Sequence, residues 1–459
     1  MMMTDALKTL AAALALTLFA ALAAIAQEGR TPAPPLSDVD RALAAFKAGR
    51  HTEALAAARR AADAAPTSAR ALTARASIAE FMGEFDEART FYDRVAAMTP
   101  DDDPGIIYRT ASYALRVGEY DRALAQLDRL LALHPQQVRW LFQYAPTRFQ
   151  AQLLRDHPSL EHIVQIKLDI LMEKGDLQQA RRMAQAYAIV QPGQDYCGQA
   201  RTLSVAPNRN REDIFKAFRL ATLGQPDAAD CIWWYGQWLS DEGYVRLGRL
   251  MVVEGARVTG SATNKEGAAR YVRIRLGGNR DVPKRAEQLF LIARQRYLRD
   301  GDIEGATRLF DECIRLAPGF ARPYNYRALM AADLGDREAA LAWFQKGLKA
   351  DADSWRTHRN LGKLLSEMER YPEAEMHLRK TVELFGDDAG GRIALARVLY
   401  AEGKYDDFLK EASAAVAILN AKTQIVDVRE FLSKFDRWGP GAALPPAPDP
   451  NVIIGWNYD

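Results

Sequence analysis

Residues 297–318 read YLRDGDIEGATRLFDECIRLAP, and the pattern in this stretch returns every 34 residues along the last third of the chain. Gly301 separates two segments in which apolar side chains such as Leu309 and Cys313 recur at helical intervals. Because glycine takes positive φ values without steric strain, Gly301 is expected to end the first helix of a hairpin. Ala306, early in the second helix, is small enough to let the two helices approach closely.

Further copies of this pattern keep the same register. The matching residues are Gly335, Ala340 and Phe344; then Leu361, Gly362, Tyr371, Ala374 and Leu378; then Gly403, Tyr405 and Ala412. Four earlier copies are centred on Gly49, Gly83, Gly118 and Gly175. One such hairpin cannot bury its apolar face alone, so neighbouring hairpins must stack into a solenoid.

A 34-residue period with a helix, a glycine turn and a second helix resembles the tetratricopeptide repeat. The resemblance is to a repeat family rather than to one protein. It implies an all-α fold, a right-handed superhelical solenoid of helical hairpins, whose usual role is to bind other proteins. Between residues 193 and 281 the register breaks, and we expect an irregular helical middle there, with helices near 212–223, 227–239, 244–254 and 265–276.

The chain is expected to divide into seven parts along its length. These are a signal peptide or uncleaved anchor (1–26), a proline-rich linker (27–38), N-terminal repeats (39–192), the irregular middle (193–281), C-terminal repeats (282–420), a capping helix (421–438), and a proline-rich tether with an apolar tail (439–459). Ser37 is a suitable N-cap for the first helix of the repeats.

The N-terminal segment indicates export. Thr9 to Ala26 is a run without charged residues that follows Lys8 and ends in a small-x-small pattern, which is typical of a cleaved signal peptide. The mature chain would then begin at Gln27 and reside in the bacterial periplasm. An uncleaved anchor is the alternative, and only in that case would the protein contact the membrane.

Composition and motif searches argue against an enzyme. The formal net charge is +2, which gives no global signal for nucleic acid, and the three cysteines lack metal-ligand spacing. No motif for a nucleophile elbow, a zinc protease or a redox pair is present. His157 and His162, beside Asp156 and Glu161, could hold a metal, but a polar surface turn is the preferred interpretation. We therefore expect no catalytic residue, no metal, no cofactor and no small-molecule substrate.

The cysteines and tryptophans leave two structural questions. Cys197 and Cys231 are either joined in a disulfide, which an exported protein permits, or are two buried thiols. Cys313 occupies a small-residue repeat position and is expected in the core. Trp233, Trp234, Tyr235 and Trp238 could form a stacking platform for sugar, but helical packing is the preferred interpretation.

A basic surface is the strongest functional signal. Residues 257–299 hold eleven lysines and arginines against three acidic residues. The resemblance also implies which positions line the concave face of the solenoid: Gln295, Arg299, Arg322, Asn325, Asp333, Arg356, Arg359, Asn360, Lys363, Arg397 and Tyr400. Arg356 and Asn360 match by type the residues with which some tetratricopeptide domains grip a terminal carboxylate, but the lysine and asparagine expected in the first repeat of such a clamp are absent. From this partial match we infer only that the groove is basic and that its ligand is acidic. Arg356, Arg359 and Lys363 are expected to be exposed in this groove.

Three functions compete on this evidence. The preferred one is a non-catalytic periplasmic scaffold that binds acidic or extended segments of an envelope or exported protein. The second is a component of a polysaccharide secretion or envelope-assembly machine. The third is a helical hydrolase or lyase with its site in the irregular middle.

The chain end carries a last expectation. Residues 451–459, which hold Trp456 and Tyr458, are too apolar to remain comfortably solvated on a proline-rich tether. We expect this tail to pack on the capping helix, and the alternative is that it occupies a groove.

Overall fold

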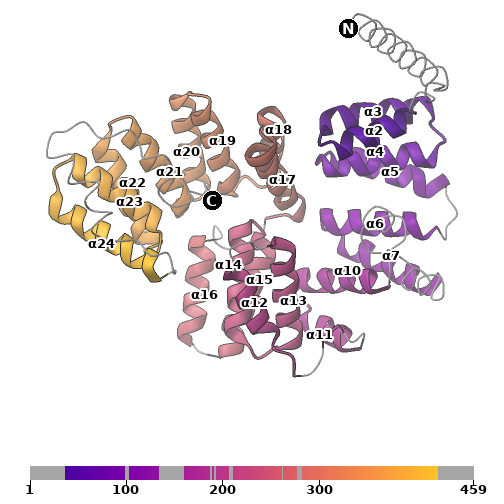
Figure 1. Ribbon diagram of the computed structural model, residues 1–459, viewed down its shortest axis with the longest axis horizontal. Coiled ribbons are helices and arrows are strands. Elements are labelled where there is room, and N and C mark those ends of the chain that lie inside the picture. The colour runs from indigo at the N-terminus through magenta and orange to yellow at the C-terminus, as the bar shows by residue number, and fades with distance from the viewer. Residues whose placement is uncertain are drawn as a thin grey trace, which may run out of the picture. The chain divides into compact units, whose positions relative to one another are not determined.

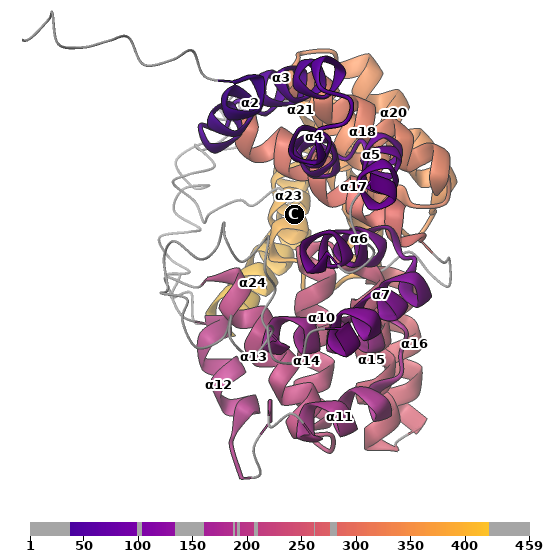
Figure 2. The same ribbon diagram turned by 90° about the vertical axis from the view of Figure 1, so that its right-hand side faces the viewer.

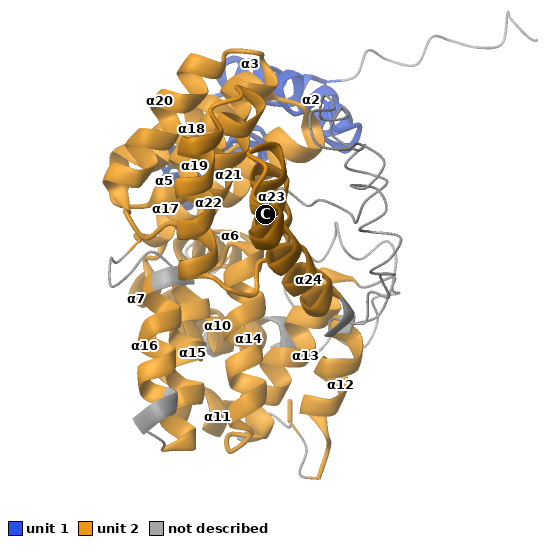
Figure 3. Cartoon of the chain, turned by 90° about the vertical axis from the view of Figure 1, so that its left-hand side faces the viewer, with its two compact units in different colours: residues 1–79, 86–98 blue, residues 80–85, 99–459 orange. Residues whose placement is uncertain are grey.

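The computed structural model describes residues 37–98, 103–133, 160–186, 189–190, 193–205, 210–260, 262–275 and 282–421. Every regular element in these ranges is helical, with no β-strand among them (Figure 1), which confirms the all-α prediction. The chain forms two compact units, distinguished in Figure 3: residues 1–79 with 86–98, and residues 80–85 with 99–459.

The described helices run from α2 to α24 in chain order. The first four are α2 (Asp38–Lys47), α3 (His51–Ala64), α4 (Ala69–Phe81) and α5 (Phe85–Met98). Then come α6 (Pro104–Val117), α7 (Tyr120–Leu133), α10 (Leu160–Glu173), α11 (Leu177–Ala186), α12 (Tyr196–Val205), α13 (Arg211–Gly224), α14 (Ala229–Glu242), α15 (Val245–Thr259) and α16 (Ala262–Arg275). The last group is α17 (Lys284–Gln295) with a π-helical turn η1 (Arg296–Asp300), α18 (Ile303–Leu316), α19 (Ala321–Asp333), α20 (Arg337–Ala350), α21 (Trp355–Glu367), α22 (Tyr371–Leu384), α23 (Ala389–Ala401) and α24 (Tyr405–Ala421).

The described part of the first unit begins with a capped helix. Ser37 Oγ accepts a hydrogen bond of 3.1 Å from the backbone N–H of Asp40, as the N-cap prediction requires. Helices α2 and α3 pack together, and Ala58 in α3 is fully buried. Arg75 in α4 reaches Glu87 in α5 at 2.7 Å, so an ion pair joins the next two helices as well.

The C-terminal hairpins turn at one repeating backbone position. Gly301, Gly335 and Gly403 have φ values of +64°, +81° and +72°, and each lies between the two helices of its hairpin. The equivalent residue in the third hairpin is Glu369, with φ +58°, the one non-glycine residue with positive φ in the described ranges. The 34-residue period is therefore visible in the backbone. In one copy a glutamate occupies the left-handed position that glycine adopts without strain.

Close packing of the hairpins aligns their first helices. Ala306, Ala340 and Ala374, early in successive second helices, are all fully buried. Each hairpin contacts the next, α18 against α19, α20 against α21 and α22 against α23. The first helices also contact one another in order, α19 with α21 and α21 with α23, so they share one face of the array.

The middle of the chain consists of helices outside the 34-residue register. The four helices expected there are present as α13, α14, α15 and α16, and α12 is a further helix that the sequence did not predict. Helices α14 and α15 approach so closely that a Cβ on Gly236 would lie 2.6 Å from the backbone nitrogen of Val252. A Cβ on Gly248 would lie 3.0 Å from the carbonyl oxygen of Gly236, so this crossing requires glycine on both helices.

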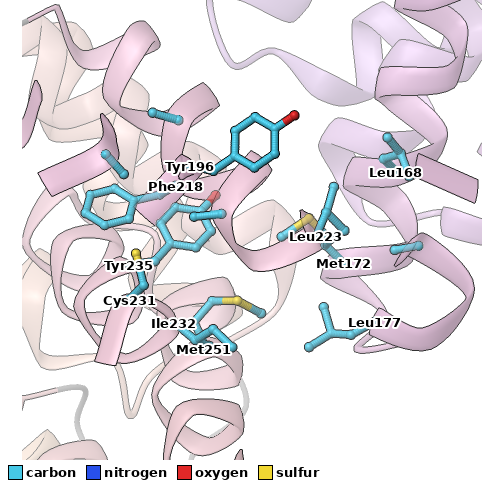
Figure 4. Packing of buried hydrophobic residues seen from close by; sticks show 14 of the residues in the cluster. Leu168, Met172, Leu177, Tyr196, Phe218, Leu223, Cys231, Ile232, Tyr235 and Met251 are labelled. Atoms are coloured by element: carbon cyan, nitrogen blue, oxygen red, sulfur yellow. The ribbon is translucent and has the colours of Figure 1, made fainter. Parts of the chain in front are cut away.

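A core of aromatic and aliphatic side chains consolidates the middle (Figure 4), and a disulfide joins two of its helices. Tyr235 is fully buried and stacks on Phe218, with ring centroids 5.5 Å apart and an interplanar angle of 12°. Cys197 in α12 and Cys231 in α14 form a disulfide whose Cα atoms are 5.8 Å apart. Cys313 is a free thiol with no exposed surface, as expected for a core residue.

The tryptophans of α14 face different neighbours. Trp234 is 39% exposed, and the guanidinium of Arg201 lies over its ring. The distance from Arg201 Cζ to the centroid of the Trp234 ring is 3.8 Å. Trp233 packs against Tyr271, whereas Trp238 belongs to the edge of the aromatic core. These rings form no common platform, and packing accounts for them.

A buried ion cluster fastens α17 to earlier helices of the same unit. Lys284 Nζ lies 2.5 Å from Glu173 Oε1 in α10 and 2.9 Å from Glu287 Oε2. Tyr120 donates a hydrogen bond of 3.3 Å to Glu173 Oε2, and α17 also contacts α6 (Figure 2). Burial acts to lower the pKa of Lys284, but Glu287 and Glu173 outweigh it and raise this pKa. The C-terminal hairpins thus begin from a fixed anchor.

Several predicted segments lie outside the described residues. These are the signal peptide (1–26), most of the linker, the predicted capping helix, the tether and tail, His157 and the side chain of His162. Among the helices that the structure describes, none combines the length and apolar character needed to cross a membrane.

Candidate functional site

The first helices of the C-terminal hairpins bring basic and amide side chains to one surface, which we call the groove. Its lining comprises Arg294 and Phe290 of α17, Arg322, Asn325 and Tyr326 of α19, Ser354, Arg356, Arg359 and Asn360 in and before α21, and Asp241 of α14. The free space between these side chains is about 20 Å³, room for about one water molecule. The groove is therefore already filled by the protein's own atoms.

An amide pair forms the floor of the groove. Asn360 Nδ2 donates a hydrogen bond of 3.0 Å to Asn325 Oδ1, and both side chains are buried. A buried amide without a partner would be destabilising, so this bond fixes the two side chains and ties α21 to α19.

Arg359 is held inside the array rather than presented to solvent. Its Nη1 lies 3.2 Å from Asp388 Oδ1 at the start of α23, and each side chain is only 9% exposed. The expectation that Arg359 is exposed is therefore wrong, and Arg356 and Lys363, expected to be exposed as well, are partly buried. A planar guanidinium can be buried against a carboxylate in this way because both charges are compensated.

The end of α14 meets three arginines from three successive first helices. Arg322 Nη2 donates a hydrogen bond of 2.8 Å to the carbonyl oxygen of Ser240. Arg294 Nη1 donates one of 3.2 Å to the carbonyl oxygen of Glu242. Arg356 Nη2 lies 3.3 Å from Asp241 Oδ1. Carbonyls of a last helical turn have no partner within the helix and carry partial negative charge, which attracts cations.

This contact was missed at the sequence level, although a signal is present. The acidic residues Asp241 and Glu242 end a helix, and Gly243 follows as its left-handed cap with φ +99°. The sequence does not specify that this end is directed at α17, α19 and α21.

Lys363 and Arg397 extend the basic character toward α23. Burial, followed by the nearby charges of Arg359 and Arg397, lowers the pKa of Lys363 to about 7 against the opposing effects of Asp388 and Glu367. Burial also lowers the pKa of Arg397. Two cationic side chains with lowered pKa values thus lie together here, and strongly shifted pKa values are enriched at functional sites.

The structure brings together only part of the predicted set. Arg322, Asn325, Arg356, Arg359 and Asn360 line the groove, and Lys363 and Arg397 adjoin it. Arg299 is exposed at the end of η1, and Tyr400 packs its ring against Tyr405 and Phe408. Arg294 and Asp241 were not predicted but line the groove.

A second hollow, of about 320 Å³, lies between α20, α21 and α22 and contains none of the predicted residues. Four leucines line it together with five polar or charged residues, one of which is His377. His377 Nδ1 lies 2.9 Å from His358 Nδ1, and burial followed by the proximity of His358 lowers the pKa of His377 to about 4. In the part of the chain that the structure describes, no group of three or more His, Cys, Asp or Glu could hold a metal ion.

The family models that match this chain all describe the tetratricopeptide repeat. Two models described as tetratricopeptide repeat match the sequence, one over residues 45–106 and the other over 108–154, 295–354 and 359–421. Protein FlbA of Caulobacter vibrioides is 37% identical over 103 residues, which cover 22% of this chain and 17% of FlbA. The match therefore spans less than a fifth of that relative.

Solved structures with this type of repeat align over long stretches at low identity. Yeast Tom70 is 11% identical, with 87% of this chain and 94% of Tom70 covered and a TM-score of 0.29. MamA from Desulfovibrio magneticus RS-1 is 20% identical, with 33% of this chain and 93% of MamA covered and a TM-score of 0.27.

Proposed function

Because this chain belongs to the tetratricopeptide repeat family, whose stacked hairpins serve as protein-binding scaffolds, we propose that its groove binds an acidic segment of a partner protein. The observation that carries the proposal is the convergence of Arg294, Arg322 and Arg356 on one acidic turn. These arginines come from three different helices, so the stacking of the hairpins determines their spacing.

The chemistry of the lining favours acidic ligands. Arginine offers several N–H donors in a planar fork, and its hydrogen bonds to carboxylates are about twice as strong as those between neutral groups. Asp241 is the one acidic member of the lining, against four arginines. A segment with carboxylates would replace that single negative charge, whereas a basic segment would be repelled.

We extend the proposal to location. The N-terminal sequence resembles a cleaved signal peptide, and the Cys197–Cys231 disulfide is of a kind that persists in oxidising compartments. Both features support a periplasmic protein whose partner belongs to the envelope or is exported. Terminal sequencing of the protein from its native cells tests this: Gln27 as the first residue supports export, and a retained Met1 contradicts cleavage.

Binding to the groove is tested with an unstructured peptide of glutamate, aspartate and serine that carries a fluorescent label. Arg322→Gln and Arg356→Gln keep a polar side chain but remove the charge, so each should weaken binding about tenfold, since a charged hydrogen bond contributes roughly 1.5–3 kcal/mol. Arg315→Gln is the matched control, because Arg315 is 67% exposed on α18 and pairs with Glu312 of the same helix. Equal affinities for the control and the two groove variants would contradict the proposal.

A further inference from the structure

We propose that the last turn of α14, residues 240–242, is an internal ligand of the groove, and that the partner segment which displaces it is the acidic C-terminal end of a helix. This inference rests on the proposed binding role of the groove and specifies both its resting state and its ligand class.

The contacts define what the groove recognises. Two of the three arginine contacts go to backbone carbonyls, those of Ser240 and Glu242, and the third goes to the carboxylate of Asp241. Backbone carbonyls that point along one direction without the usual partner of a helix interior occur at the C-terminal end of a helix. Here the Ser240 carbonyl accepts only a 3.3 Å hydrogen bond from the cap residue Gly243 beside that from Arg322. An extended acidic peptide supplies carboxylates without this set of carbonyls, so the arrangement fits a helix end better.

The internal ligand leaves no space for a second one. About 20 Å³ remains beside it, which is far less than a peptide turn occupies. A partner must therefore displace the α14 turn. Because only molecules with the turn undocked can bind, the apparent affinity of the partner falls in proportion to the fraction of undocked molecules.

A point of entry exists at the carboxylate. The side chain of Asp241 is 52% exposed, whereas that of Arg356 is 14% exposed. The Asp241–Arg356 contact lies at the rim, where solvent weakens ion pairs, so an incoming carboxylate can compete there first.

Gly243 provides a way to undock the turn without changing any groove residue. A Cβ at this position would lie 2.8 Å from Leu291 Cδ2 and 3.3 Å from Phe290 Cε1, both on α17. Gly243→Ala therefore strains the capping turn of α14, whose φ is +99°, and adds a methyl group against these two side chains of α17. Gly260→Ala is the matched control, because Gly260 caps the next helix with φ +67° and has no neighbouring atom within 4 Å of its added Cβ.

The probe is an alanine-based helical peptide that ends in Leu-Ser-Asp-Glu-Gly with an amidated terminus, and its affinity is measured by fluorescence anisotropy. Gly243→Ala should bind it at least about fivefold more tightly than the native chain, since a left-handed alanine and the clash both disfavour docking. Gly260→Ala should match the native chain. Asp241→Asn, which adds no strain, should also increase affinity.

The outcomes separate the two proposals. If Gly243→Ala and Asp241→Asn bind the helical peptide no better than the native chain, while Arg356→Gln still weakens the unstructured acidic peptide, the internal ligand is refuted and the groove remains a binding site. If the unstructured peptide binds every form as well as the helical peptide does, the helix-end preference is refuted. If no form binds either peptide, the groove itself is refuted.

Discussion

The side-chain amide of Asn360 donates a 3.0 Å hydrogen bond to the side-chain oxygen of Asn325, across two adjacent first helices. The bond holds α21 in fixed register with α19. Arg322 and Arg356 stand at equivalent positions, one 34-residue repeat apart, so this register also determines how far apart their guanidinium groups lie. Ligand recognition in the groove therefore depends on a buried contact that touches no ligand.

Glu369 is predicted to be a weak point of the third hairpin. It adopts φ +58° at the turn where the other three C-terminal hairpins carry glycine, and a left-handed residue with a Cβ is strained. Glu369→Gly should raise the free energy of unfolding by about 1 kcal/mol, measured by urea denaturation.

The reciprocal change provides the control. Gly403 has φ +72° and open space around its added Cβ, so Gly403→Glu introduces strain without a clash. It should destabilise the chain by a similar amount. If Glu369→Gly leaves the urea midpoint unchanged, the strain is relieved by contacts of the Glu369 side chain.

Lys363 should give stability a distinct pH dependence. Its pKa falls from the ordinary 10.5 to about 7 because of burial and the neighbouring Arg359 and Arg397. Between pH 7 and 10.5 the unfolded chain binds this proton and the native chain does not, so the free energy of unfolding rises with pH across that window and this contribution is constant below pH 7. The slope is at most about 1.4 kcal/mol per pH unit.

Replacement of Lys363 removes this effect. Urea unfolding of Lys363→Met, compared with the native chain at several pH values, should show a difference that is largest near pH 7 and shrinks toward pH 10.5. Lys410→Met, at an exposed position on α24, serves as the control and should follow the native curve. Parallel curves for Lys363→Met and the native chain would show that Lys363 remains charged in the native state.

Ala306 should tolerate no larger side chain. It is fully buried between the helices of its hairpin, so Ala306→Leu should overpack that contact and destabilise the chain by roughly 1–3 kcal/mol. Ala342→Leu makes the same change on the exposed face of α20 and should be nearly neutral. A thermal midpoint that Ala306→Leu leaves unaltered would be inconsistent with the observed packing.

The sequence predicted local features better than the arrangement of the groove. The 34-residue period predicts the glycine turns at Gly301, Gly335 and Gly403 and the buried alanines. These features could be predicted because they depend only on contacts within one hairpin. Burial of Arg359 could not be predicted, because its partner Asp388 belongs to the next repeat. The approach of Asp241 to Arg356 is less predictable still, since 115 residues separate them and α14, which carries Asp241, lies outside the repeat register.

Hydrogen–deuterium exchange of the full chain, with and without the helical peptide that ends in Leu-Ser-Asp-Glu-Gly, tests the central claim most directly. The backbone N–H of Tyr244 donates to the carbonyl of Leu239 at 2.8 Å and closes the last turn of α14. If the peptide takes the place of that turn, amides 243–244 should exchange faster on peptide addition, while those of α19 and α21 exchange more slowly. Unchanged exchange at 243–244, with slower exchange confined to the second helices α20 and α22, would contradict the account.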